Sequence, residues 1–162
     1  MKLGEYTKKR NFAATPEPAK GRRPAAKAGL IYVIQKHAAS RLHYDLRLEA
    51  EGVLLSWAVP KEPSADTKVR RLAIQVDDHP LSYADFEGEI AEGQYGAGNV
   101  EIWDTGQYEL VERQDGFLRV RFSGRRLNGP WKLVKTQFAP GSWLFAASRG
   151  ATMGPAAPAP AG

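Results

Sequence analysis

The feature that most constrains the fold is a series of short runs rich in β-branched and aromatic residues, which recur along the middle of the chain with turn residues between them. Runs of this length and composition are typical of β-strands. The sequence predicts strands at residues 31–35, 42–49, 53–59, 71–76, 100–103, 108–113, 117–122, 131–135 and 143–146. Gln114-Asp115-Gly116 predicts a hairpin turn between two of them, and Asp104-Thr105-Gly106 predicts another turn.

Many short strands in a chain of 162 residues indicate one mainly β domain. We expect a small antiparallel β-barrel with short flanking helices, because closing a sheet on itself removes exposed strand edges. A sandwich of two sheets is the alternative. The tryptophans all fall in predicted strands and are expected in the core, not as platforms for stacking bases. They are Trp57, Trp103, Trp131 and Trp143.

Charge and composition divide the chain into three parts. Residues 1–30 carry eight of the 23 Lys and Arg residues but only two of the 18 Asp and Glu residues, which predicts an irregular, basic N-terminal arm. Residues 31–149 form the expected barrel domain, and residues 150–162, mostly Ala, Pro and Gly, a disordered tail. A basic arm beside a near-neutral domain favours nucleic acid as a partner. The alternative is a solvated leader that binds nothing in particular.

The absence of cysteine excludes several kinds of site. Disulfides, thiolate zinc sites and cysteine nucleophiles all need this residue, so any metal must be held by His, Asp or Glu. No run of about 18 apolar residues occurs, and the N-terminus has no apolar stretch of signal-peptide length. We therefore expect a soluble, cytoplasmic protein with no membrane partner.

The segment 42–49 combines an apolar face with an ionisable face. Successive side chains of a strand point to opposite sides, so His43, Asp45, Arg47 and Glu49 share the face opposite the leucines and Tyr44. Imidazole and carboxylate groups can ligate a divalent transition metal, and a guanidinium group can hold phosphate oxygens in a bidentate fork. This pattern favours phosphate chemistry. The alternative is the polar outer face of an edge strand.

The other two histidines strengthen the case for a site. His37 just precedes the ionisable strand, and His79 lies in an expected loop after the strand 71–76, where rigid scaffolds often carry functional groups. Alone, His79 would more often be a surface residue. The glycine-rich segment 92–99 superficially resembles a phosphate-binding loop, but it leads into a predicted strand and is interpreted as a tight crossing.

Several ordered motifs point to one protein family. They are QKH at 35–37, RLHYDLRLE at 41–49, SWAVPK at 56–61, HPL at 79–81, YADFEG at 83–88, EGQYGAG at 92–98 and WDTG at 103–106. Together they resemble the 3′-phosphoesterase (end-healing) domain of bacterial ATP-dependent DNA ligase D, over roughly residues 5–135.

That resemblance implies a barrel enzyme that depends on manganese, or another divalent transition metal. It would remove 3′-terminal ribonucleosides and 3′-phosphates from primer-templates, leaving a 3′-OH for the ligase, polymerase and end-binding proteins of end joining on the nucleoid. The implied metal ligands are His37, Asp45 and His79. The residues implied in catalysis are His43, Arg47, Arg71, Tyr83 and Lys61. His43 would be an orienting donor or a general acid.

Substrate binding is implied at Arg47 and Arg71, and at Glu17 and Asn11 of the arm. The family pattern has an acidic residue where this chain has Asn11, so ribonucleoside removal is expected to suffer more than phosphate removal. Two alternatives without catalysis are a barrel that only binds single-stranded nucleic acid and a recruiting module of a repair complex.

Overall fold

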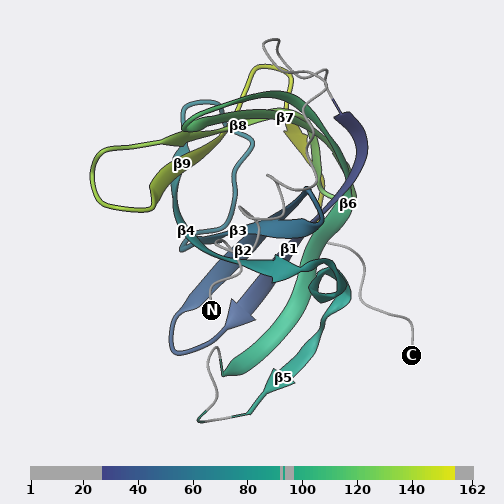
Figure 1. Ribbon diagram of the computed structural model, residues 1–162, viewed down its shortest axis with the longest axis vertical. Helices are drawn as coiled ribbons and strands as arrows, with labels where there is room; N and C mark the ends of the chain where they lie inside the picture. Colours follow the sequence, from purple (N-terminus) through teal and green to yellow (C-terminus); the bar gives the residue numbers. More distant parts are fainter. Residues whose placement is uncertain (1–26, 92, 94–96, 156–162) are drawn as a thin grey trace.

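The computed structural model describes residues 27–91, 93 and 97–155, which form ten β-strands and one short 3₁₀ helix, η1 (Figure 1). The elements are β1 (Lys27–Ala38), β2 (Leu42–Ala50), β3 (Val53–Val59), β4 (Arg70–Pro80), η1 (Leu81–Asp85), β5 (Gly88–Ile90), β6 (Gly98–Gln114), β7 (Phe117–Gly124), β8 (Leu127–Lys135), β9 (Ser142–Ala147) and β10 (Thr152–Met153). Among these residues, no helix has the length and apolar character needed to cross a membrane.

The strands close into the expected antiparallel barrel. The order around the wall is β1-β2-β3-β4-β9-β8-β7-β6, and pairing of β6 with β1 closes it, while β5 and β10 add to β6 and β8 (Figure 1). The expected flanking helices are wrong, since η1 is the one helix in the described part of the chain. Connections such as 51–52, 115–116 and 125–126 are too short for a helical turn, and the longer link 60–69 contains two prolines.

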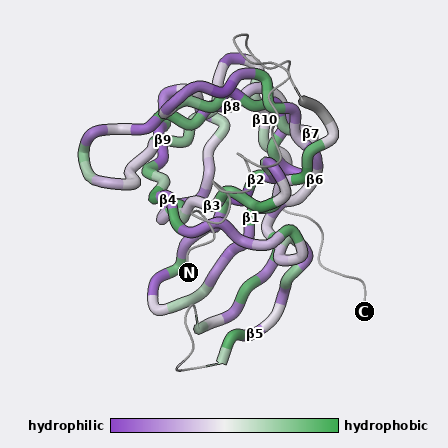
Figure 2. Tube along the Cα trace, viewed as in Figure 1, coloured by the Kyte–Doolittle hydropathy of each residue, from purple (hydrophilic) through white to green (hydrophobic). Residues whose placement is uncertain are grey.

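Both faces of the wall formed by β1, β2 and β3 are buried. The interior face carries the main core, including Tyr32, Leu46 and Trp57, and Figure 2 shows how apolar and polar segments alternate along the chain. On the opposite face Val33 and Leu54 pack against Ala84 of η1 in a small apolar cluster. The ionisable face of β2 therefore lies under a covering segment, which excludes the solvated face of an edge strand.

Most of the strand pattern is confirmed. The predicted alternation in β2 holds except at its first residue, Leu42, which is 47% exposed. The hairpin at 114–116 joins β6 to β7, with Gly116 at a φ of 77° that favours glycine. Three of the tryptophans are buried in the core and Trp103 packs against it from a partly buried position.

The turn expected at residues 104–106 is wrong, because these residues lie inside the 17-residue strand β6. The Asp104 carboxylate accepts hydrogen bonds from the backbone N–H groups of Arg126 and Leu127, at 2.8 and 3.0 Å, and from the Tyr32 hydroxyl at 2.5 Å. The register of β6 on β1 shifts beside it, at Trp103. Asp is common in turns, which explains the wrong expectation. Here it serves instead as a buried hydrogen-bond acceptor beside a β-bulge.

The expected domain boundaries shift at both ends. Strand β1 begins at Lys27, within the span assigned to the arm, and the rest of that arm lies outside the described residues. The expectation of a disordered tail from residue 150 is wrong for its first part. There β10 pairs with β8 through Thr152 and Asn128, and the Gly154 carbonyl accepts a hydrogen bond from Arg126 Nε.

Replacing Asp104 by Ala should lower the free energy of unfolding by about 3 kcal/mol, because it leaves buried donors without an acceptor. Urea denaturation followed by tryptophan fluorescence measures this change. Glu101→Ala, at an exposed position of the same strand, is the control and should change it by less than about 0.5 kcal/mol. Equal stability of the two variants would contradict a structural role for the Asp104 network.

Candidate functional site

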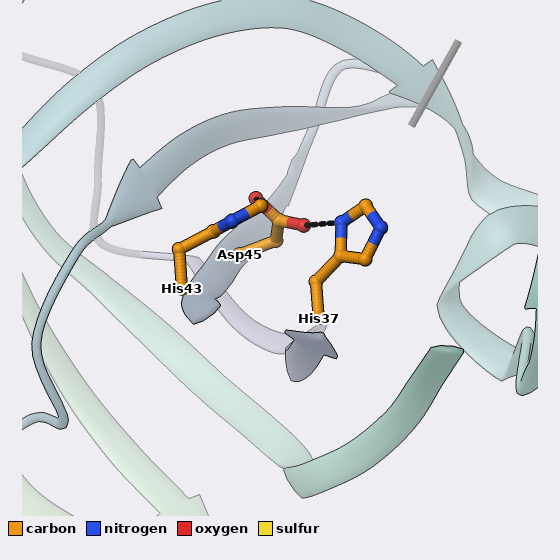
Figure 3. A group of neighbouring side chains, drawn as sticks. All are labelled: His37, His43 and Asp45. Atoms are coloured by element: carbon orange, nitrogen blue, oxygen red, sulfur yellow. Dashed lines mark ion pairs between the residues drawn. The ribbon is translucent and has the colours of Figure 1, made fainter. Parts of the chain in front are cut away.

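The strongest candidate site is a cluster of His37, His43 and Asp45 on the outer face of β1 and β2 (Figure 3). His37 Nδ1 lies 3.4 Å from Asp45 Oδ2, and His43 Nε2 lies 3.3 Å from Asp45 Oδ1. One potential ligand atom from each residue lies within 4.8 Å of the others. His37 and Asp45 are buried and His43 is half-buried.

The strand register explains why these three side chains meet. His37 and His43 are directly opposite each other across the β1–β2 pair, and Gln35 is opposite Asp45. Residues two apart in a strand share a face, so all four side chains lie on one side of the wall. The short connection 39–41 fixes this register.

The protonation of His43 leaves two electron-pair acceptors facing each other. Its Nδ1 lies 3.1 Å from the Arg41 carbonyl, which can only accept, so Nδ1 carries the proton. In the neutral ring, Nε2 then presents its lone pair to the Asp45 carboxylate. Such an arrangement needs a cation between the two groups, either a proton or a metal ion. Metal-binding histidines commonly donate their other N–H to a carbonyl in this way.

Two of the separations within the cluster suit ligands of one small divalent ion. Two ligand atoms that each lie about 2.1 Å from one ion are separated by roughly 3.0–3.4 Å in tetrahedral or octahedral geometry. His37 Nδ1 and Asp45 Oδ2, 3.4 Å apart, and His43 Nε2 and Asp45 Oδ1, 3.3 Å apart, each fall at this separation, while the three ligand atoms as a set lie within 4.8 Å and would have to draw together around one ion. Two imidazoles and one carboxylate suit a divalent transition metal.

The cluster shifts the pKa of its own members. Burial alone would raise the pKa of Asp45, but the hydrogen bond with His43 and the charges of Arg47 and the two histidines outweigh it and lower that pKa. The same hydrogen bond raises the pKa of His43 against the opposing effect of burial. The cluster therefore favours a negative carboxylate that binds a cation.

Arg47 connects this cluster to the residues around η1. Its NH2 lies 3.4 Å from Asp45 Oδ2, its Nε donates to Gln35 Oε1 at 2.6 Å, and its NH1 lies 3.2 Å from His79 Nδ1. Its guanidinium carbon lies 4.9 Å from the centre of the Tyr83 ring. The result is a buried, positively charged group held in one orientation beside the candidate metal ligands.

His79 lies on the Arg47 side of the site. It is the next-to-last residue of β4, not part of a loop as expected, and its ring centre is 4.9 Å from that of Tyr83. Among the described residues its polar contacts all use Nδ1, with Arg47, with the Asp77 carbonyl at 2.9 Å and with Ser56 Oγ at 3.4 Å. Burial, and then the charge of Arg47, lower the pKa of His79. Its Nε2 makes no polar contact within the described part of the chain.

Two polar residues of the site have roles that sequence reasoning missed. Gln35 is fully buried, and its amide nitrogen donates to the carbonyls of Tyr83 and Phe86, so it ties η1 to the wall. Ser56 is also fully buried, beside His79. The signal for Gln35 was its spacing, two residues before His37 on the same strand.

Other expected site residues lie apart from the cluster. Arg71 pairs with the core residue Phe145, so it is on the interior side of β4, where its Nε donates to the Glu62 carbonyl at 2.7 Å. Lys61 is exposed in the link after β3. Asn11 and Glu17 lie outside the described residues. The roles expected for these four residues stay predictions.

The glycine-rich segment 92–99 is described only at residues 93 and 97–99. In this part Gly98 has a φ of 135°, and a Cβ placed there would lie 2.4 Å from the Ala38 carbonyl oxygen. Glycine is thus needed where the chain enters β6 against the end of β1, as expected for a tight crossing.

Comparison with known proteins gives a consistent family context. A family model described as the DNA ligase D 3′-phosphoesterase domain matches residues 35–135. The multifunctional non-homologous end joining protein LigD of Pseudomonas aeruginosa is 52% identical over 141 residues, covering 83% of this chain and 17% of the relative. The corresponding DNA repair protein of Mycobacterium tuberculosis is 46% identical over 139 residues, covering 83% and 18%. The chain thus spans less than a fifth of the length of these relatives.

Affinity for a divalent metal should fall as the pH is lowered through the raised pKa of His43, because a proton then takes the place between His43 and Asp45. Manganese titration followed by electron paramagnetic resonance, from about pH 8 to about pH 5.5, measures this dependence. His43→Gln should bind more weakly and with a flatter pH dependence. Affinity that is constant over this range would contradict the assignment of the cluster as a metal site.

Proposed function

The chain belongs to the DNA ligase D 3′-phosphoesterase domain family, and from this premise we propose that it is a metal-dependent hydrolase that processes DNA 3′ ends. It removes 3′-terminal ribonucleosides and 3′-phosphates and leaves a 3′-OH. The observation that carries the proposal is the pair of acceptors formed by His43 Nε2 and the Asp45 carboxylate, beside a buried guanidinium group. A cation site next to a fixed positive charge suits a phosphate ester.

The proposed metal ligands are His37, His43 and Asp45, and manganese is the proposed ion. This set differs from the sequence expectation by exchanging His79 for His43. When bound, the ion would act as a Lewis acid toward a phosphate oxygen and offset the negative charge of the ester. Three protein ligands leave coordination positions for substrate.

Arg47 and His79 are proposed to bind the phosphate. Contacts with Gln35 and Asp45 hold the guanidinium group of Arg47 in one orientation, so its side chain does not have to move to bind a phosphate. Because the Asp77 carbonyl, 2.9 Å from His79 Nδ1, can only accept, Nδ1 carries the proton of the neutral ring, and Nε2 would donate to a phosphate oxygen when the bound anion brings a second proton to the ring. Tyr83, beside both residues, would donate its hydroxyl proton to the same group.

Burial of the cluster argues for catalysis over simple strand binding. A barrel that only holds a single strand needs exposed cations and aromatic rings, whereas buried ionisable groups are costly unless they are paired. Here Asp45 and Arg47 are both buried. Ligase, polymerase and end-binding proteins of end joining are the proposed partners, since the relatives are named as end-joining proteins.

The two histidine assignments can be separated by metal affinity. His43→Ala should lower manganese affinity roughly a hundredfold or more, because it removes a ligand. His79→Ala should leave that affinity within about threefold of the original while turnover falls roughly a hundredfold. Calorimetric titration and a 3′-phosphate primer assay measure the two quantities. An equal loss of metal affinity in His79→Ala would return His79 to the ligand set.

Turnover itself should require both the metal and Asp45. A labelled primer-template ending in one 3′-ribonucleotide, and a second ending in a 3′-phosphate, should both be converted to a 3′-OH in the presence of manganese. Chelation, or Asp45→Asn, which keeps the size of the side chain, should reduce the rate at least about a thousandfold.

Two arms of the same assay sharpen the result. Asn11→Asp should raise ribonucleoside removal and leave phosphate removal unchanged if the missing carboxylate limits that step. Tight DNA binding without turnover at either end would overturn the proposal in favour of a binding module.

A further inference from the structure

An aromatic ring lies beside the proposed phosphate-binding residues without being part of the core. Phe86 directly follows η1, and its ring stacks on that of Tyr83, with centres 5.0 Å apart and planes 18° apart. Tyr83 packs against the small apolar cluster around Ala84, whereas Phe86 is part of neither apolar cluster in the described part of the chain. Its ring is also partly exposed to solvent. Core packing alone therefore does not explain an aromatic residue at this position.

The two stacked rings, which we call the aromatic ledge, extend from the phosphate-binding groups. The Tyr83 ring centre lies 4.9 Å from that of His79 and 4.9 Å from the guanidinium carbon of Arg47. Phe86 stacks on the same ring and lies at the other end of the ledge. A nucleotide has a matching order of groups, since its sugar joins a charged phosphate to a flat base.

The ledge is held by the same residue that orients Arg47. The amide nitrogen of Gln35 donates to the carbonyls of Tyr83 and Phe86, at 2.9 and 3.2 Å, while its amide oxygen accepts from Arg47 Nε at 2.6 Å. The Phe86 N–H also donates to the Tyr83 carbonyl, at 3.1 Å. Because Gln35 is fully buried, the position of the ledge relative to the guanidinium group is fixed. A surface fixed in this way loses little conformational freedom when a ligand binds.

The residues next to Phe86 suit a neutral, flat group. Gly88 has a φ of 143°, which favours glycine, so the residue beside the ring has no side chain; a Cβ placed there would lie 3.9 Å from Phe86 Cζ. Asp85 and Glu87 are exposed and acidic, and the Glu87 carboxylate accepts from the Ile102 N–H at 2.7 Å. Negative charge at this end of the ledge disfavours a second phosphate but does not repel a base.

We propose that Phe86 binds the nucleobase of the 3′-terminal nucleotide by stacking, while the phosphate of that nucleotide lies at Arg47 and His79. This inference rests on the proposed function, from which it takes the position of the phosphate. Every base has a π-face, so stacking on an aromatic side chain depends little on sequence. The ledge thus selects nucleotide ends over other phosphate esters without selecting one base.

Affinity for two labelled primer-templates, measured by fluorescence anisotropy with a metal chelator present, tests the proposal. Both end in a 3′-phosphate, but in one the terminal nucleotide is an abasic tetrahydrofuran. The unchanged protein should bind the end that has a base about tenfold more tightly. Phe86→Leu, which keeps an apolar side chain but loses the ring, should abolish this preference, and Phe86→Tyr should retain it. Phe138→Leu, at a 79% exposed position between β8 and β9, is the matched control and should also retain it.

Three results would overturn the proposal: equal binding of the two ends by the unchanged protein, a preference that survives Phe86→Leu, or equal weakening of both ends in Phe86→Leu. The last result would show that the ring only supports the structure of the site. Turnover of the same primers with manganese is measured separately and tests the proposed function. A protein that prefers the base but does not turn over would contradict the hydrolase alone, so the failures of the two proposals are distinguishable.

Discussion

The Asp45 carboxylate is the group on which the arrangement of the site depends. It lies on a buried face of β2, where an unpaired negative charge would be strongly unfavourable. His37, His43 and Arg47 surround it within 3.4 Å, and each of them is held by the same strand pair. Removing the carboxylate would therefore leave Arg47 without its closest anionic partner and would remove the group that both imidazoles contact.

The site is electrostatically divided along β2. On one side Asp45 raises the pKa of His43, and on the other burial and Arg47 lower the pKa of His79. The pKa values of two histidines, on β2 and β4, are thus shifted in opposite directions by Asp45 and Arg47, two residues apart on β2. One imidazole is prepared to attract a cation and the other to remain neutral beside a positive charge, which is the division of labour that a metal-assisted reaction on an anionic ester needs.

The sequence predicted the structure best where the spacing of the apolar residues and the types of residue indicate the same element. Alternation along 42–49 predicted both faces of β2, and the spacing of turn residues predicted the 114–116 hairpin. The grouping of the histidines could not be read in the same way, because it depends on which residues of β1 and β2 are opposite and on the irregular pairing of β3 with β4. Asp104 resembled a turn residue because its partners, Tyr32 and the backbone near residue 126, are far away along the chain.

The location of the cluster on the outside of a closed wall has a geometric consequence. The barrel interior is filled by side chains, so a polymer cannot pass through it, and the residues around Asp45 are approached from the side instead. A polymer whose end approaches the site from the side can be of any length, because it does not have to pass through the barrel. The same separation of faces means that the interior can be repacked without altering the spacing of the ionisable groups.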